Sequence, residues 1–188
     1  NEIVISCLHF IDVKASSLGV VIEKQLAEEL SCIMVDRQQI KQVLMNLALN
    51  AIDAMKANGG RLTVVTRHLT GTDGTRWIQI EVSDSGCGIT PEDLPHIFDP
   101  FFTTKHESTE HVGTGLGLSI VHQIIQEHAG RVEARSVVGQ GTTFILTLPE
   151  RTALDSAPAP ASPSRPGTLI PFPTIASLLQ RPTGTEGP

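Results

Sequence analysis

Four short motifs follow one another along this chain, and together they constrain its fold more than any other feature. They are NLALNA at 46–51, DSGCG at 84–88, GTGLGLS at 113–119 and GQGTTF at 139–144. Each motif alone is weak, because a pair of glycines can simply mark a turn. Together they supply an amide pair suited to a metal, a carboxylate beside a tight loop, and a glycine-rich loop that opens a helix. A site for a magnesium nucleotide requires these parts.

Composition excludes several classes of protein. The 188 residues carry a net charge of −6 at pH 7 and show no stripe of Lys and Arg, which argues against a nucleic-acid surface. The longest apolar runs fall far below the roughly 18 residues that a membrane span needs, and no signal peptide opens the chain. We therefore expect no membrane contact by this segment. The 3 cysteines, an odd number, predict reduced thiols in a cytoplasmic protein.

Hydrophobic periodicity predicts alternating helices and strands. Helices are expected at residues 1–12, at 37–55 behind an Asp36 cap, and from 118 to the Ala129-Gly130 pair, with a short helix start at 90–93. Strands are expected at 20–26, 32–35, 61–67, 77–83, 131–136 and 142–148.

The composition divides the chain near residue 149. Residues 1–149 are expected to form one domain with a single core. Residues 150–188 are rich in Pro, Ala, Ser and Thr and cannot bury enough apolar surface to offset the entropy lost on ordering. We expect this segment to be a disordered tail or linker, and its short apolar stretches to be remnants of a linker rather than a docking motif.

Two asparagines mark the helix expected at 37–55. Asn46 and Asn50 lie four residues apart and share one face, on which Asp53 lies one turn further on. An amide oxygen is a hard, neutral ligand that suits Mg²⁺ with its waters and phosphate oxygens. The pattern therefore nominates Asn50 as the ligand of a metal that bridges a triphosphate. A solvated polar face is the plain alternative.

Asp84 follows a strand and precedes two alternating glycines, Gly86 and Gly88. The carboxylate is thus fixed at the end of a strand, and the glycines leave room for a flat ligand. A carboxylate accepts a hydrogen bond from an exocyclic amine, which adenine presents and guanine presents differently. An Asp-Gly turn would explain one glycine, but not two beside a strand.

The glycines of 113–117 lead directly into a helix, whose free N–H groups and positive dipole end suit phosphate oxygens. A dinucleotide fingerprint is excluded, because the loop at 98–112 replaces the preceding strand and no βαβ unit follows. The loop at 98–117 is long enough to be functional and mobile. Lys105 in it could neutralise the terminal phosphate when the loop closes, or be an ordinary surface lysine.

Five segments resemble, in order, the motifs of the ATP-binding catalytic domain of bacterial sensor histidine kinases, within the gyrase, chaperone, histidine kinase and MutL superfamily. FFTTK at 101–105 and NAIDA at 50–54 are similar to the nitrogen-regulator and oxygen-sensor branch. The segments similar to the N box, the first glycine box, the F box, the second glycine box and the last glycine box are 42–55, 84–88, 97–102, 113–118 and 139–143.

This resemblance implies an α+β fold, a two-layer α/β sandwich known as the Bergerat ATP-binding fold. In it a mixed, mostly antiparallel sheet packs on one side against helices, and a flexible ATP lid spans about 98–117. The implied cofactors are ATP and Mg²⁺, with Asn50 as the metal ligand, Asp84 as acceptor for the adenine amine and Asn46, Asn50 and Lys105 as catalytic residues. The residues expected around the nucleotide are Asn50, Asp53, Asp84, Gly86, Gly88, Ile89, Phe98, Thr104, Lys105, Gly113, Thr114, Gly115, Leu116, Gly117, Leu118 and Thr143.

Asn46 separates a kinase from a hydrolase. ATPases of the superfamily usually carry a glutamate at this position, and its carboxylate activates water, whereas an amide cannot take the proton. The resemblance therefore favours transfer of the γ-phosphate to a protein histidine, which needs positioning more than deprotonation.

None of the 7 histidines has the sequence context of a phosphoacceptor in such kinases. We expect that the chain lacks its acceptor and dimerisation domain, that it is a monomer on its own with little turnover, and that a response regulator acts downstream. Two alternatives stay open: a serine kinase of the anti-sigma type, and an ATP-binding regulatory module or pseudokinase.

Overall fold

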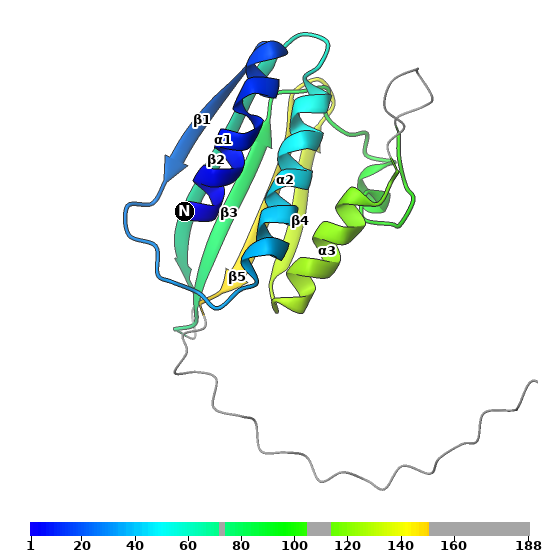
Figure 1. Cartoon of the computed structure of the whole chain (residues 1–188). Helices are drawn as coiled ribbons and strands as arrows, with labels where there is room; N and C mark the ends of the chain where they lie inside the picture. The colour runs from blue at the N-terminus through cyan, green and yellow to red at the C-terminus, as the bar shows by residue number, and fades with distance from the viewer. Residues whose placement is uncertain (72–73, 105–113, 151–188) are drawn as a thin grey trace, which may run out of the picture. The chain divides into compact units, whose positions relative to one another are not determined.

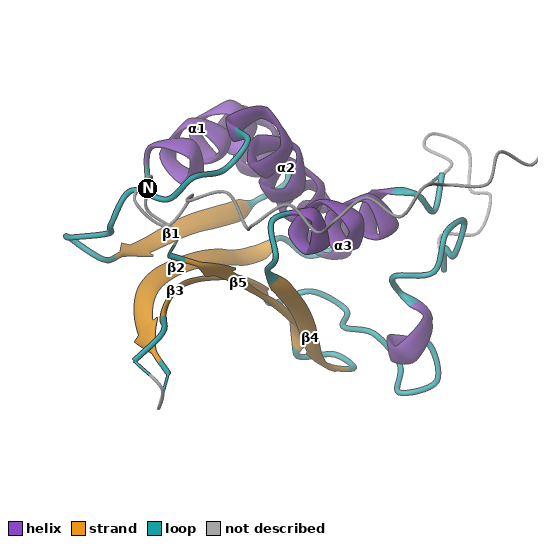
Figure 2. Ribbon diagram, turned by 90° about the horizontal axis from the view of Figure 1, so that it is seen from below, coloured by secondary structure: helices purple, strands orange, loops and turns teal. Residues whose placement is uncertain are grey.

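The computed structural model describes residues 1–71, 74–104 and 114–150. Within them a five-stranded sheet is covered on one face by three α-helices, with α2 between α1 and α3 (Figures 1 and 2). The elements in chain order are α1 Glu2–Ser17, β1 Val20–Leu26, α2 Arg37–Ala54, β2 Gly60–Thr70, β3 Arg76–Asp84, the 3₁₀ turn η1 Leu94–His96, α3 Gly117–Glu127, β4 Arg131–Val137 and β5 Gly141–Pro149.

The strand order is β1-β2-β3-β5-β4. β1 and β2 pair in parallel, and the other three pairs are antiparallel. The predicted two-layer fold, with a mixed, mostly antiparallel sheet packed on one side against helices, is confirmed. β5 is inserted between β3 and β4, so the last hairpin brings the GQGTTF motif beside the end of β3.

α2 begins where the sequence predicts and for the predicted reason. Asp36 Oδ1 accepts hydrogen bonds from the backbone N–H groups of Gln38 at 2.8 Å and Gln39 at 3.1 Å. These bonds satisfy two of the donors that a helix start leaves unpaired. The apolar stripe of the helix is buried, at Ile40, Val43, Leu44, Leu47, Ala48, Ala51 and Ile52.

The two faces of the sheet differ in what covers them. Side chains that alternate toward the helices, such as Leu62, Phe144 and Leu146, belong to the hydrophobic core. Their neighbours along each strand point to the opposite face, since successive residues of a strand alternate. On β5, Thr142 therefore lies on the helix side and Thr143 on the far side.

The strand predicted at 32–35 is wrong, because these residues lie in the loop between β1 and α2. The alternation that suggested a strand is real: Ile33 and Val35 pack against the core, while Cys32 and Met34 are exposed. In this loop the chain leaves the sheet to reach the start of α2, and none of the described strands pairs with it. An extended, half-buried segment and a strand give the same pattern.

The other predicted strands and helices are present, with boundaries shifted by a few residues; the helix start at 90–93 leads into η1. The predicted tail lies outside the described residues, apart from Glu150. So do positions 105–113 of the predicted lid. Across the described ranges, the helices fall short of the length and apolar character needed to cross a bilayer.

Candidate functional site

The candidate site begins at the end of β3, where Asp84 turns its carboxylate toward β5. Asp84 Oδ1 accepts hydrogen bonds from the backbone N–H of Gly86 at 2.8 Å and of Thr142 at 3.3 Å. In the described part of the chain both protein hydrogen bonds of this carboxylate end on Oδ1. The other oxygen, Oδ2, is therefore left to accept a hydrogen bond from a ligand.

Burial raises the pKa of Asp84, while the N–H groups of Gly86 and Thr142 act in the opposite direction. Desolvation disfavours the charged form of a carboxyl group, and hydrogen bonds to the carboxylate favour it. A partly desolvated acceptor discriminates strongly between ligands, because a ligand that cannot donate leaves it unpaired.

The glycines of the DSGCG loop allow two close approaches of backbone to backbone. A Cβ on Gly86 would lie 2.7 Å from the Ala54 carbonyl oxygen at the end of α2, and one on Gly88 would lie 2.3 Å from the Val137 carbonyl oxygen. The backbone of Cys87, between the two glycines, is hydrogen-bonded on both sides. Its N–H donates to Ala54 O at 3.1 Å, and its carbonyl oxygen accepts from Gly139 N at 2.8 Å. The loop is thus held between α2 and the β4–β5 turn.

A small hydroxyl network lies beside this loop on the helix side of the sheet. The backbone N–H of Ile89 donates to Ser136 Oγ at 2.8 Å, and Ser136 Oγ lies 2.9 Å from Thr142 Oγ1. The strand register pairs Asp84 with Thr142 and Thr142 with Ser136. These three side chains form one row across β3, β5 and β4, which we call the inner row.

Thr143, which the resemblance places around the nucleotide, is not part of the inner row. Its Oγ1 is 2.9 Å from Ser83 Oγ on the face of the sheet away from the helices. The structure brings Thr142, and not Thr143, beside Asp84. Alternation along β5 places Thr142 on the same side as the core residue Phe144, but only the register with β3 brings it beside Asp84.

The two predicted asparagines lie on α2. Asn46 Nδ2 donates to the carbonyl oxygen of Gly117 at 3.1 Å, which joins the middle of α2 to the start of α3. Asn50 is half-buried one turn further on. Asp53 Oδ1 lies 3.6 Å from Lys14 Nζ, so this carboxylate also contacts α1.

Among the described residues, no side chain caps the start of α3 at Gly117, so its first N–H groups can donate to a ligand. The loop before it packs tightly, because a Cβ on Gly115 would lie 2.4 Å from the carbonyl carbon of Phe101. The N–H of Phe101 donates to Gly115 O at 3.0 Å. Thr114 is exposed, while Leu116, Gly117 and Leu118 are half-buried. The contact places Phe101 of the FFTTK motif against Gly115 of the second glycine loop.

Phe98 anchors the start of the predicted lid. Its ring lies 5.5 Å from the ring of His122 on α3 and 6.4 Å, edge-on, from that of Phe144 on β5. The half-buried Phe98 is therefore a packing residue at the base of this loop. Thr104 is exposed, and Lys105 and Gly113 lie outside the described residues.

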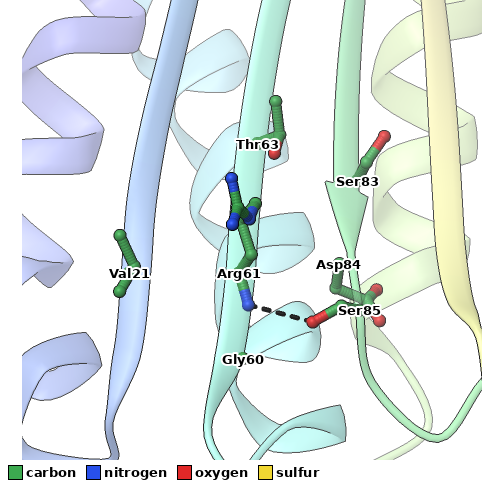
Figure 3. Close-up of a pocket in the computed structure, with 7 residues that line it drawn as sticks. All are labelled: Val21, Gly60, Arg61, Thr63, Ser83, Asp84 and Ser85. Atoms are coloured by element: carbon green, nitrogen blue, oxygen red, sulfur yellow. Dashed lines mark hydrogen bonds between the residues drawn. The ribbon is translucent and has the colours of Figure 1, made fainter.

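Two hollows lie among the described residues. One, of about 350 Å³, is lined by Arg61, Thr63 and Ser83 on the far face of the sheet, and also by Asp84 of the inner row and Ser85 (Figure 3). The other, of about 580 Å³, lies between the start of α1 and the loop before α2.

The described ranges contain no cluster of three or more His, Cys, Asp or Glu side chains that could hold a metal ion. A magnesium ion that accompanies a nucleotide needs only one or two side-chain ligands, because phosphates and waters supply the rest. The half-buried Asn50 amide, on the helix face next to the start of α3, fits that mode of binding.

Comparison with known proteins gives a consistent result. A model of the family "Histidine kinase-, DNA gyrase B-, and HSP90-like ATPase" matches residues 35–152. The sensor histidine kinase ZraS of Salmonella typhi is 38% identical over 149 residues, which are 79% of this chain and 30% of ZraS. The sensor protein FixL of Bradyrhizobium diazoefficiens is 44% identical over 117 residues, covering 62% of this chain and 22% of FixL.

Solved structures agree. The catalytic domain of histidine kinase ThkA superposes with a TM-score of 0.67 at 32% identity, covering 80% of this chain and 93% of that domain. ThkA in complex with the response regulator protein TrrA superposes with a TM-score of 0.64 at 30% identity, covering 80% of this chain and 40% of that one. The chain thus spans less than a third of the curated relatives but nearly all of a solved catalytic domain.

Proposed function

The chain belongs to the family of histidine kinase-, DNA gyrase B- and HSP90-like ATPases, and we propose that it binds Mg-ATP and transfers the γ-phosphate to a histidine of a separate phosphoacceptor domain. Such transfer is the first chemical step of two-component signal transduction. The relatives are named as sensor histidine kinases, which favours this function over the serine kinase and the pseudokinase.

One observation carries the proposal: Asp84 keeps an acceptor oxygen for a ligand at the end of β3, while the uncapped start of α3 offers N–H donors. The first feature suits the amino group of adenine, and the second suits phosphate oxygens. Gly86 and Gly88 keep the backbone of the adenine loop close to α2 and the β4–β5 turn. Thr142 joins Asp84 as a base-side residue of the site.

Asn50 is the proposed magnesium ligand. Mg²⁺ held by the Asn50 amide oxygen would neutralise charge on the phosphates. Asp53 supports this end of α2 through its contact with Lys14. Lys105, in the proposed lid, neutralises the terminal phosphate. Gly113 and Thr114 belong to the second glycine box, which we propose binds the phosphates. Thr104 follows the F-box segment in the proposed lid.

The transfer step needs positioning more than proton removal. A ring nitrogen of the acceptor histidine attacks the γ-phosphorus, a P–N bond forms, the bond to the β–γ bridging oxygen breaks, and ADP leaves with that electron pair. Asn46 cannot act as a base, since an amide does not accept a proton at neutral pH. Its hydrogen bond to Gly117 O instead orients the start of α3, where the phosphates bind.

The partners follow from this chemistry. The acceptor histidine belongs to a dimerisation domain, and the next acceptor is a response regulator, as the ThkA–TrrA complex suggests by analogy. Cys7, Cys32 and Cys87 are free, which supports a cytoplasmic location for this segment. We propose that the isolated chain is a monomer, with residues 1–149 as the catalytic domain and 150–188 as a disordered tail or linker.

The test has two arms. Calorimetric titration measures the affinity for ATP with and without Mg²⁺ in the wild type and Asn50→Ala. Incubation with ATP labelled in the γ-phosphate and a phosphoacceptor domain from a related sensor kinase then measures transfer. We expect magnesium-dependent binding that Asn50→Ala weakens, and acid-labile, alkali-stable label on the acceptor domain.

Asn58→Ala is the matched control, because Asn58 is exposed beyond the end of α2. Label on a serine, stable in acid, would favour the anti-sigma type of kinase. Tight ATP binding without transfer to any acceptor would favour the regulatory module. Absence of ATP binding by the folded wild type would overturn the proposal.

A further inference from the structure

Ser136 lies at the centre of the inner row, although no sequence motif pointed to it. Ile89 N donates to its Oγ at 2.8 Å, Gly141 O lies 3.0 Å from this Oγ, and Thr142 Oγ1 lies 2.9 Å away. One serine hydroxyl therefore connects the adenine loop, the β4–β5 turn and the threonine beside Asp84.

The three bonds can be satisfied by one arrangement of protons. A hydroxyl carries a single proton, and a carbonyl oxygen can only accept. If Ser136 donates its proton to Gly141 O, both remaining neighbours must donate to Ser136: the N–H of Ile89 does so already. The hydroxyl of Thr142 then has to point its proton at Ser136, which accounts for the 2.9 Å contact.

We propose that Ser136 is a positioning residue for base recognition. The Thr142 hydroxyl donates its proton to Ser136 Oγ, so the Thr142 oxygen, like the Asp84 carboxylate, can only accept a hydrogen bond from the base. Asp84 and Thr142 then select a base edge that carries an amino group and disfavour one that carries a carbonyl oxygen. The inference rests on the proposed ATP-binding function and deepens it.

The position of Thr142 next to Asp84 connects this proton to the ligand. The two residues are register partners, and the N–H of Thr142 donates to Asp84 Oδ1 at 3.3 Å. A base presented to Asp84 Oδ2 therefore lies near the Thr142 oxygen, directly or through a water. A 6-oxo base brings an acceptor to that place, and two acceptors that face each other without a proton leave both unpaired.

The far side of the same strands provides a matched control. Ser83 and Thr143 make a serine–threonine hydrogen bond of the same length, 2.9 Å, on the opposite face of the sheet. Ser83→Ala and Ser136→Ala each remove one hydroxyl from a half-buried serine that contacts a threonine of β5. Ser136 Oγ also accepts a hydrogen bond from Ile89 N, so we expect Ser136→Ala to lower the melting temperature more than Ser83→Ala does.

The experiment measures the affinities for ATP and for inosine triphosphate: adenine carries an amino group beside an unprotonated N1, and hypoxanthine a carbonyl oxygen beside an N1–H. The proteins are the wild type, Ser136→Ala, Ser136→Thr and Ser83→Ala, each with its melting temperature. We expect the ratio of ATP to inosine triphosphate affinity to fall by roughly three- to tenfold in Ser136→Ala, the range of one hydrogen bond. Ser136→Thr keeps the ratio because it keeps the hydroxyl, and Ser83→Ala keeps it as well.

A ratio left unchanged in Ser136→Ala, with only a lower melting temperature, assigns Ser136 a structural role and overturns the inference. An equal fall in Ser83→Ala does the same. If Ser136→Ala does not fold, Ser136→Cys, which keeps the size and weakens the hydrogen bonds, must lower the ratio. Wild-type protein that binds neither nucleotide contradicts the proposed function itself, a result distinct from binding with an unchanged ratio.

Discussion

The inner row and its counterpart on the far face of the sheet are built from the same parts. Ser136 and Thr142 lie 2.9 Å apart on the helix side, and Ser83 and Thr143 lie 2.9 Å apart on the other side. The two threonines are successive residues of β5. Their chemistry and hydrogen-bond length are the same, and their surroundings differ.

Only the inner pair is connected to the loop that carries Gly86 and Gly88, through Ile89, and to the carboxylate of Asp84, through Thr142. In the outer pair, Ser83 lines the hollow of the far face together with Arg61, which forms an ion pair with Glu23. The comparison teaches that residue type and hydrogen bonding do not make a site. The face of the sheet decides which hydroxyl meets a ligand and which only stabilises a surface.

Gly141→Ala is expected to have the largest effect, because it disturbs the pairing of β5 with the end of β3, which holds Thr142 beside Asp84. Gly141 has φ of +107°, and an added Cβ would lie 1.9 Å from the Asp84 carbonyl oxygen. The strand must shift or lose its pairing, so we expect a loss of more than about 3 kcal/mol in the free energy of unfolding. Denaturant unfolding measures it.

Gly139→Ala is the control for this change. Gly139 also has a positive φ, +75°, but an added Cβ there meets nothing within 4 Å. We expect it to cost about 1 kcal/mol, from backbone strain alone. Equal losses in the two variants would show that the contact with Asp84 does not matter.

Asp84→Asn should weaken ATP binding by about a hundredfold, the range for a hydrogen bond to a charged group. The amide oxygen can keep the bonds from Gly86 and Thr142, while its NH₂ group replaces the acceptor Oδ2. Calorimetry checks the affinity, and far-UV circular dichroism checks that the fold is kept. Ser83→Ala, the neighbour on the far face, should bind ATP like the wild type; a similar loss there would remove the distinction between the faces.

Thr142→Val and Thr143→Val sharpen the comparison at adjacent positions. Both remove a hydroxyl and keep the shape, but only Thr142 lies beside Asp84. We expect ATP affinity to fall roughly three- to tenfold for Thr142→Val and to stay within about twofold for Thr143→Val. Competition against a fluorescent nucleotide measures both. The reverse order would assign the site to the far face.

The smallest effect concerns pH. Burial raises the pKa of Asp84, so ionising it costs stability in full above the raised pKa, and this cost disappears as pH falls from the raised value to the ordinary aspartate pKa. ATP binding changes in the opposite direction, because only the carboxylate accepts at both oxygens. At the pH that equals the raised pKa, half of the sites are protonated and the affinity should be about twofold lower. Titrations across pH check this, and Asp84→Asn should lack that step.

Much of this fold could be predicted because its signals are local. The apolar stripe of α2 and its Asp36 cap are readable within one helix. β2, β3 and β4 alternate as expected, whereas β5, between two neighbours, is buried at successive residues. The segment at 32–35 could not be assigned correctly, since an extended loop packed on a core alternates as a strand does, and only the pairing distinguishes them.

The candidate site was partly predictable for the same reason. Asp84, Gly86, Gly88 and the glycines before α3 lie in contiguous motifs, so the chain itself brings them together. Ser136 and Thr142 could not be found this way, because their bond depends on the register between β4 and β5, and Ile89 reaches Ser136 from 47 residues away in sequence.

The sequence by itself determined the family, the order of the elements and the presence of a carboxylate, an amide pair and two glycine loops. Those properties follow from local propensity and from motifs of a few adjacent residues. Only the tertiary structure decided that Thr142 rather than Thr143 stands beside Asp84, that Asn46 joins α2 to α3, and that Ser136 links the loop to β5. Each of these depends on which segments pair and in which register, a property of the folded sheet that no single segment encodes.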